Sequence, residues 1–197
     1  MKNKENVAEI PKLMNPTEFG LDNDTENRRF LRSLMKKKKT IIEETDDYLL
    51  FRTGNADGNI VMYNKQTARM DYWVRYTTIT KSEIGKTVTQ VGIWRKRGSP
   101  INQGITERMF FDYLLKYWPT VMSDSEQTLY GQTFWFNMLA KAYNRGYKFG
   151  LVNLNHRATD WFDSTQQSFD DWIKNAEEQA YGTEPKHMAY RFLISNP

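Results

Sequence analysis

The sequence predicts an α/β (α+β) protein with a mixed central sheet of six to seven strands, antiparallel in its first half, with a parallel pair in the middle and helices on its flanks. Apolar runs separated by turn residues fill the first half. Capped amphipathic helices alternate with strands in the second half. Because strands on either side of a connecting helix usually run parallel, the second half is expected to supply the parallel pair. At 197 residues, of which 39% are hydrophobic, the chain fits one domain, residues 24–197.

An extended arm, residues 1–23, is expected to precede this domain. It is polar and aperiodic, and Pro11 and Pro16 interrupt any continuous helix. Such an arm is expected to be mobile by itself. An ordered arm would therefore require a protein partner, in a virion or on a host protein.

A short basic helix is expected next, capped by Asp22 or Asp24 and running to about Lys38. The formal net charge of +4 is a mild bias. A run of cations is typical of a solvated face, and it also suits phosphate contacts of a nucleic acid, so both readings stay open. The basic residues are Arg28, Arg29, Arg32, Lys36, Lys37, Lys38 and Lys39.

Strands of an antiparallel meander are expected from residue 39 to residue 97. KTIIEE, YLLFRT and NIVMYN are apolar runs separated by turn residues, and VTQVGIWRKR ends the series. ARMDYWVRYTTI alternates with a period of two, which predicts one shared face for Met70, Tyr72, Val74 and Tyr76. The loop GSPINQG then leads to a helix over ITERMFFDYLLKYW.

The segment from Ser123 to Leu154 predicts the end of a strand, a capped helix and another strand. Ser123 and Glu126 form a capping-box pattern, and Gly146 stands where a C-cap glycine is expected. NHRATDWFDSTQQ is expected to be a loop, SFDDWIKNAEEQAYG a second capped helix and HMAYRFLIS a terminal strand.

Composition argues against several classes of protein. The absence of cysteine removes disulfides and thiolate chemistry, and two histidines without partners at ligand spacing predict no metal site. No run of about eighteen apolar residues and no signal-peptide core occurs, so a cytoplasmic protein without a membrane partner is expected.

Five residues of the capped helix and its C-terminal end carry a family resemblance: Asn137, Ala140, Tyr143, Gly146 and Tyr147. With the order of elements, they resemble the GNAT (Gcn5-related N-acetyltransferase) family over roughly residues 40–155, with one residue fewer before the tyrosine and before the glycine. SDSEQTLYGQTFW is also similar to degenerate GNAT-like proteins of tailed bacteriophages. The resemblance implies acetyl-CoA as cofactor, N-acyl transfer as activity, and the host cytoplasm or a virion as location.

The resemblance also implies roles for particular residues. Tyr143 would protonate the leaving thiolate and Asn137 would contact the cofactor, while Asp124 and Glu126 are candidates for the base, although helix capping explains both carboxylates equally well. Pro100 stands where the family pattern has glycine or alanine. The pyrophosphate would bind the residues before and at the helix N-terminus: Arg95, Arg97, Gly98, Gln103, Gly104 and Thr106.

Three functions therefore remain open. The first is an acetyl-CoA-dependent N-acyltransferase, the second a non-catalytic GNAT-like module that acts by protein contact in a virion or on a host protein. The third is a nucleic-acid-binding module that uses the basic helix.

Overall fold

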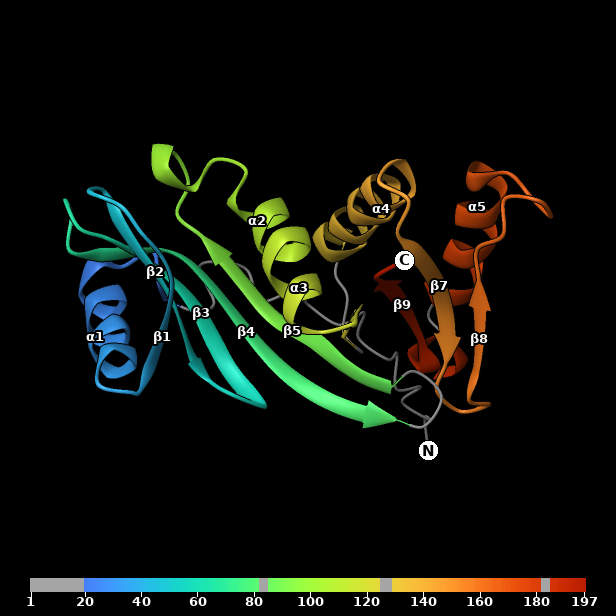
Figure 1. Ribbon diagram of the computed structural model, residues 1–197, viewed down its shortest axis with the longest axis horizontal. Coiled ribbons are helices and arrows are strands. Elements are labelled where there is room, and N and C mark those ends of the chain that lie inside the picture. The colour runs from blue at the N-terminus through green and yellow to red at the C-terminus, as the bar shows by residue number, and fades with distance from the viewer. Residues whose placement is uncertain (1–19, 82–84, 125–128, 182–184) are drawn as a thin grey trace, which may run out of the picture. The chain divides into compact units, whose positions relative to one another are not determined.

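The computed structural model describes residues 20–81, 85–124, 129–181 and 185–197 (Figure 1). These residues contain nine strands and form two compact units. We call the described part of Met14–Lys81 and Lys86–Pro119 the meander unit, and that of Thr120–Pro197 the C-terminal unit. The mixed α+β class is confirmed, and the strand number exceeds the expected six to seven.

The meander unit contains five strands that neighbour one another in sequence order. The first four pair antiparallel, as the apolar runs joined by short turns predict. Turns of two to four residues join these four strands, which keeps consecutive strands adjacent. The strands are β1 Lys39–Glu44, β2 Tyr48–Gly54, β3 Asp57–Asn64, β4 Arg69–Lys81 and β5 Gly85–Arg95.

A β-bulge at Asp71 interrupts the pairing of β3 with β4. Met62 pairs with Tyr72, but the next residue, Tyr63, pairs with Met70, so Asp71 is the extra residue on β4. The bulge shifts the alternation by one residue. The prediction that Met70 shares a face with Tyr72 is therefore wrong, because Met70 packs in the same cluster as Trp73.

Helix α1, Asp24–Met35, covers the Met70 face. Its cap is Asn23, not Asp22 or Asp24: the Asn23 Oδ1 accepts hydrogen bonds from the backbone N–H groups of Thr25 (2.9 Å) and Glu26 (3.3 Å). The helix buries its apolar side against the sheet. The buried residues of this cluster are Leu21, Leu31, Leu34, Phe51, Val61, Met70, Trp73 and Trp94.

Of the predicted arm, residues 1–19 lie outside the described part of the chain. Gly20–Asn23 form a turn before α1, and Leu21 is only 4% exposed within the α1 cluster. The protein partner expected for the arm stays a prediction.

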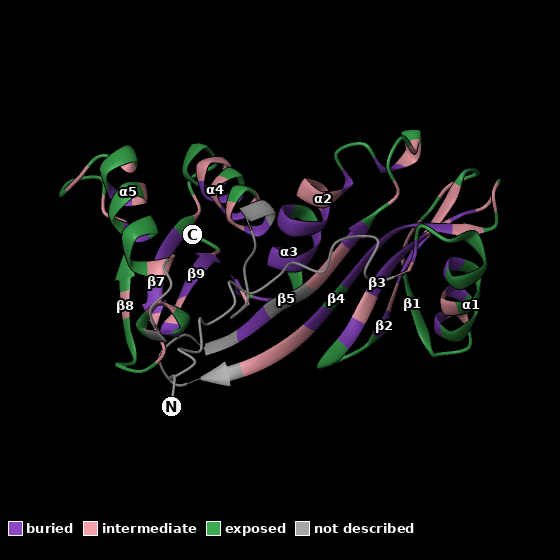
Figure 2. Ribbon diagram, turned by 180° about the vertical axis from the view of Figure 1, so that it is seen from behind, coloured by how far each residue is buried: buried purple, intermediate pink, exposed green. Residues whose placement is uncertain are grey.

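The opposite face of the meander packs against the helix predicted over residues 105–118, which ends at Tyr117 in the structure. A short 3-10 turn, Pro100–Asn102, precedes it. The helix consists of α2 Ile105–Arg108, a π-helical stretch Met109–Leu114 (η2) and α3 Leu115–Tyr117. Five of the six π-helical residues are buried (Figure 2). The ring of Trp118, after the helix, lies 5.1 Å from that of Tyr76 on β4.

The C-terminal unit is built on a second set of strands in the order β6-β9-β7-β8. All three pairings are antiparallel. Strands β6 and β7 flank α4 in the sequence and run in the same direction, as predicted, but β9 lies between them. The strands are β6 Thr120–Met122, β7 Lys148–Asn153, β8 Ala158–Trp161 and β9 Tyr190–Ser195.

Helices α4, Leu129–Asn144, and α5, Phe169–Ala180, pack against one face of these strands. The register of β7 with β9 places Phe149 and Phe192 on the same face. Trp135 of α4 stacks on Phe192 at 6.4 Å, and Trp172 of α5 meets Phe149 at 5.2 Å between ring centroids. Gly146 (φ 72°) ends α4 and the Ser168 side chain caps α5, both as predicted.

The prediction of a loop at residues 158–161 is wrong, because these residues form strand β8. Its four residues pair with β7 from Gly150↔Trp161 to Asn153↔Ala158, and most of them are exposed. A polar, exposed strand lacks the hydrophobic alternation by which a strand is recognised in a sequence.

Candidate functional site

The loop proposed for phosphate binding joins β5 to α2 in the meander unit. Gly98 (φ 73°) and Gly104 (φ 68°) adopt left-handed conformations, and no atom lies within 4 Å of the position that a Cβ would take at either glycine. Gly104 is the N-cap residue of α2, and no side chain in the described part of the chain caps this helix. The first turn therefore lacks a side-chain acceptor for its backbone N–H groups.

Asp71 fixes this loop to the sheet. Its carboxylate accepts hydrogen bonds from Ser99 Oγ (2.6 Å) and from Asn64 Nδ2 (2.8 Å). Its backbone oxygen accepts from the Lys96 N–H (2.8 Å) and from Asn102 Nδ2 (3.1 Å). The Asp71 side chain is buried, so the β-bulge supplies an anchor beneath the loop.

The positive charges of the loop point into solvent. Arg95 and Arg97 are exposed, as are Gly98, Gln103 and Gly104, while Thr106 is half-buried. Arg108 is directed elsewhere: its guanidinium lies 3.2 Å from the Glu43 carboxylate and 3.3 Å from the Tyr48 hydroxyl. The loop thus combines two exposed guanidinium groups with an uncapped helix N-terminus, an arrangement that attracts anions.

Tyr143, the predicted acid, belongs to an aromatic cluster of the C-terminal unit. Its ring stacks on Phe169 (4.8 Å, 14°) and meets Phe162 edge-on at 5.6 Å. The side chain is 45% exposed, so its ring is packed on one side only. The cluster also contains Phe149 and Trp172.

The other predicted residues of the C-terminal unit have separate surroundings. Asn137 is exposed on α4, and Glu126 lies outside the described residues. Asp124 is half-buried. Burial, together with the negative charge of Asp124, raises the pKa of Tyr181. Burial lowers the pKa of Arg191, and the charge of Asp124 partly offsets that effect. Asp124 therefore lies within electrostatic range of a buried cation, which gives it a structural role in compensating charge.

Ser123 forms hydrogen bonds with strand β9, and Glu126, the other residue of the capping box expected for α4, lies outside the described residues. The Ser123 Oγ accepts a hydrogen bond from the Phe192 N–H (3.0 Å), and the Ser123 N–H donates to the Phe192 oxygen (2.9 Å). Ser123 thus extends the pairing of β6 with β9 by one residue.

The structure brings the predicted residues together in two groups. Arg95, Arg97, Gly98, Gln103, Gly104 and Thr106 belong to one loop and helix start of the meander unit. Asp124, Asn137 and Tyr143 belong to the C-terminal unit.

The basic helix is a third candidate surface. All seven of its predicted cations are exposed: Arg28, Arg29, Arg32, Lys36, Lys37, Lys38 and Lys39. Arg29 lies 3.6 Å from the Glu26 carboxylate, and Lys39 Nζ donates to the Met35 oxygen at 2.9 Å. Since the opposite side of α1 is buried in the core, the arginines are held on an outward face.

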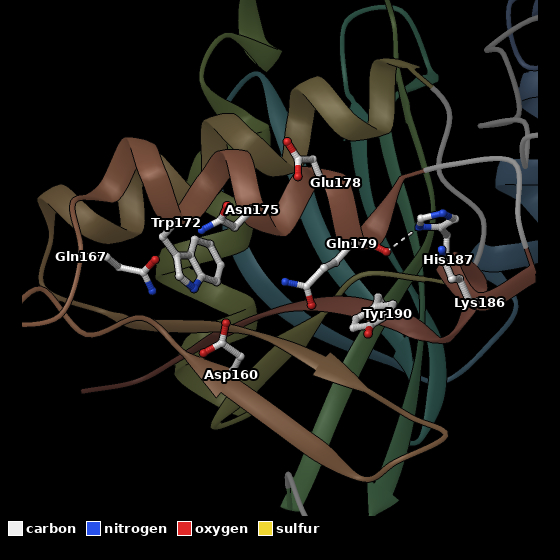
Figure 3. Close-up of a pocket in the computed structure, with 9 residues that line it drawn as sticks. All are labelled: Asp160, Gln167, Trp172, Asn175, Glu178, Gln179, Lys186, His187 and Tyr190. Carbon is white, nitrogen blue, oxygen red and sulfur yellow. Dashed lines mark hydrogen bonds between the residues drawn. The ribbon is translucent and has the colours of Figure 1, made fainter.

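Sequence reasoning missed a pocket in the C-terminal unit (Figure 3). Its volume is about 510 Å³, and it lies between α5, β8, the 3-10 turn Pro185–Ala189 (η3) and the start of β9. Asp160, Trp172 and His187 lie on its walls and come from three separate elements, β8, α5 and η3. No local sequence motif predicts such a site, because its residues come together only when β8, α5 and η3 pack against one another.

The described residues contain no group of three or more His, Cys, Asp or Glu side chains arranged to hold a metal ion. None of the described helices combines the length and the apolar character needed to cross a membrane.

Comparison with protein-family models, with curated proteins and with solved structures finds no match to this chain.

Proposed function

We propose that the meander unit binds the pyrophosphate of acetyl-CoA at the loop between β5 and α2. One observation carries the proposal: the Asp71 contacts hold Lys96, Ser99 and Asn102 in place under an uncapped helix N-terminus. Backbone N–H groups at a helix N-terminus bind phosphate oxygens, and nearby arginines add charge-assisted hydrogen bonds.

The donor set of the loop fits a pyrophosphate. Arg95 and Arg97 are exposed and can turn toward a bound anion. The space at Gly98 and Gly104 leaves the backbone accessible to a ligand. Pro100 offers no N–H, so the backbone donors come from the residues on either side of it.

Acetyl-CoA supplies an activated acyl group when bound, and the GNAT resemblance implies its transfer to an amine. In this proposal Tyr143 would protonate the leaving thiolate, and Asp124, Glu126 or a water molecule would take the proton of the amine. An exposed fraction of 45% leaves part of the Tyr143 side chain accessible to a ligand.

Calorimetric titration with acetyl-CoA tests the binding step. We expect a double substitution, Arg95→Ala with Arg97→Ala, to weaken binding by about tenfold or more, since hydrogen bonds to charged groups contribute roughly 1.5–3 kcal/mol each. Arg75→Ala removes another exposed arginine of the same unit and is the matched control. Absence of heat and of thermal stabilisation at millimolar acetyl-CoA would exclude this function.

The stacking of Tyr143 on Phe169 favours a second candidate, a non-catalytic GNAT-like module, because the contact gives the ring a sufficient structural role. An acyl-transfer assay on a panel of amines separates the two. Catalysis requires that Tyr143→Phe lower the rate by at least tenfold while acetyl-CoA still binds. Binding without transfer, in both the parent protein and Tyr143→Phe, indicates the non-catalytic module.

The exposed cations of α1 favour a third candidate, binding of a nucleic acid. Fluorescence anisotropy with a DNA duplex should then show affinity that falls steeply with salt, with a log–log slope of about −0.9 for each phosphate contact. Substituting Arg28, Arg29 and Arg32 by Glu should abolish binding of the DNA duplex. Lack of binding at low ionic strength identifies the basic residues as a solvated face.

A further inference from the structure

The pocket of the C-terminal unit contains a buried hydrogen-bond donor for which the described residues provide no acceptor. Trp172 is 1% exposed, and its indole Nε1 has no hydrogen-bond partner among the described residues. An indole nitrogen can only donate. A buried donor without a partner destabilises a protein by roughly 1–3 kcal/mol, so an unmade bond at this position calls for an explanation.

The Trp172 ring is held so that the donor faces the pocket. The ring packs against Phe149 (5.2 Å, 75°) and Phe162 (6.1 Å, 74°). In Figure 3 the indole nitrogen turns toward the side of the pocket where Asp160 stands. The aromatic cluster therefore fixes the direction of the N–H group before any ligand arrives.

The remaining walls carry both acceptors and donors. Asp160 and Glu178 are exposed, and neither carboxylate forms an ion pair or hydrogen bond with the described part of the chain. Asn175 on α5 offers an amide with both functions. His187 Nδ1 lies 2.7 Å from the Gln179 backbone oxygen, which can only accept, so this nitrogen carries the proton and Nε2 is the acceptor in the neutral ring.

The hydrogen-bond donors and acceptors on the pocket walls limit the chemical class of ligand that can bind. A phosphate could contact Lys186 of the pocket lining, but two carboxylates, Asp160 and Glu178, oppose its negative charge. An ammonium group suits the carboxylates but cannot accept a hydrogen bond from Trp172. A hydroxyl group both donates and accepts, so several hydroxyls on one molecule can satisfy Trp172, the carboxylates and the Asn175 amide together.

We propose that this pocket binds a neutral polyhydroxylated ligand of the carbohydrate class. One hydroxyl oxygen accepts from Trp172 Nε1, and neighbouring hydroxyls donate to Asp160 and Glu178. The volume of about 510 Å³ lies within the range of small-molecule sites. The inference is independent of acetyl-CoA binding, because every residue that it uses belongs to the C-terminal unit.

Nuclear magnetic resonance of the indole N–H groups provides a direct test. The chain has six tryptophans, so six indole signals are expected and can be assigned by triple-resonance experiments. The full chain is titrated with glucose, galactose, mannose, N-acetylglucosamine and trehalose in turn. At least one sugar should shift the Trp172 signal with saturation at millimolar concentration.

Trp94 is the matched internal control. Its Nε1 is also buried and without a partner among the described residues, but it belongs to the meander unit. Its signal should stay unchanged during the titration. Asp160→Ala and Glu178→Ala should each weaken binding at least fivefold, while Lys174→Ala, an exposed α5 residue outside the pocket lining, should leave it unchanged.

Three outcomes overturn the proposal. A Trp172 signal that no sugar moves means that the pocket does not take this class of ligand. A larger response to spermidine or to inorganic phosphate assigns the pocket to an amine or an anion instead. Equal shifts of Trp94 and Trp172 indicate a general solvent effect without a specific site.

Discussion

The ring of Tyr143 stacks on the ring of Phe169, with centroids 4.8 Å apart and ring planes inclined by 14°. This contact joins the end of α4 to the start of α5 within the C-terminal unit. Phe162 meets both rings edge-on, which holds the stacked pair in place. The residue that the sequence selects as an acid is thus also a packing residue, and the two roles can be separated by substitution.

Tyr143→Ala should lower the free energy of unfolding by about 1–3 kcal/mol, because an aromatic pair contributes roughly 0.5–1.5 kcal/mol beyond the area that it buries. Tyr143→Phe keeps the ring and should change stability by less than about 0.5 kcal/mol. Urea unfolding followed by circular dichroism measures both. Equal losses in the two variants would show that the hydroxyl, and not the ring, stabilises the fold.

Asp71→Ala should destabilise the protein by about 2–4 kcal/mol, since it leaves the donors of Asn64 and Ser99 without their buried acceptor. Ser99→Ala removes one of these bonds and should cost about 1 kcal/mol. Hydrogen exchange should also show faster exchange of the Lys96 N–H in Asp71→Ala, as the loop loses its anchor. Unchanged exchange at Lys96 would contradict the anchoring role.

Asn27→Ala should also be strongly destabilising, by about 2–4 kcal/mol. The buried Asn27 side chain donates to the Leu21 oxygen (3.1 Å) and the Met70 oxygen (2.9 Å), and it accepts from the Met70 N–H (2.8 Å). Its loss leaves backbone groups of two segments unpaired. Asn23→Ala, which removes only the cap of α1, should cost about 1 kcal/mol and serves as the comparison in thermal unfolding.

Stability should fall as the pH rises from about 10 to about 12, because burial raises the pKa of Tyr113 from its ordinary value of 10.0 to about 12. In that interval the unfolded chain releases the phenol proton while the folded chain keeps it, so the folded state loses stability with pH. Burial raises the pKa of Tyr72 in the same direction. The full contribution is present below pH 10.

Tyr113→Phe has no phenol proton to release, so its stability should fall less steeply in this interval. Chemical unfolding of the two proteins at several alkaline pH values measures the difference in slope. Parallel curves would mean that Tyr113 ionises as freely in the folded state as in the unfolded state.

Local sequence determined much of the secondary structure. Apolar runs separated by turn residues define β1 to β3, and an alternating pattern defines β4, while the Gly146 and Ser168 signals mark the end of α4 and the start of α5. These patterns depend on burial of one face and on backbone groups within a few residues. The exposed positions of Arg28, Arg29 and Arg32 likewise follow from the apolar side of α1.

Tertiary contacts decided what a local pattern does not contain. Asp71 becomes a loop anchor only because a bulge opposite Tyr63 turns it out of the strand pairing and toward Ser99. Strand β8 forms because β7 offers it a pairing edge. The pocket at Trp172 needs α5, β8 and β9 together, and its free indole N–H results from the packing of one ring against two others. Local periodicity therefore determined which segments become helices and strands, whereas long-range pairing and packing decided which polar groups meet and which remain available to a ligand.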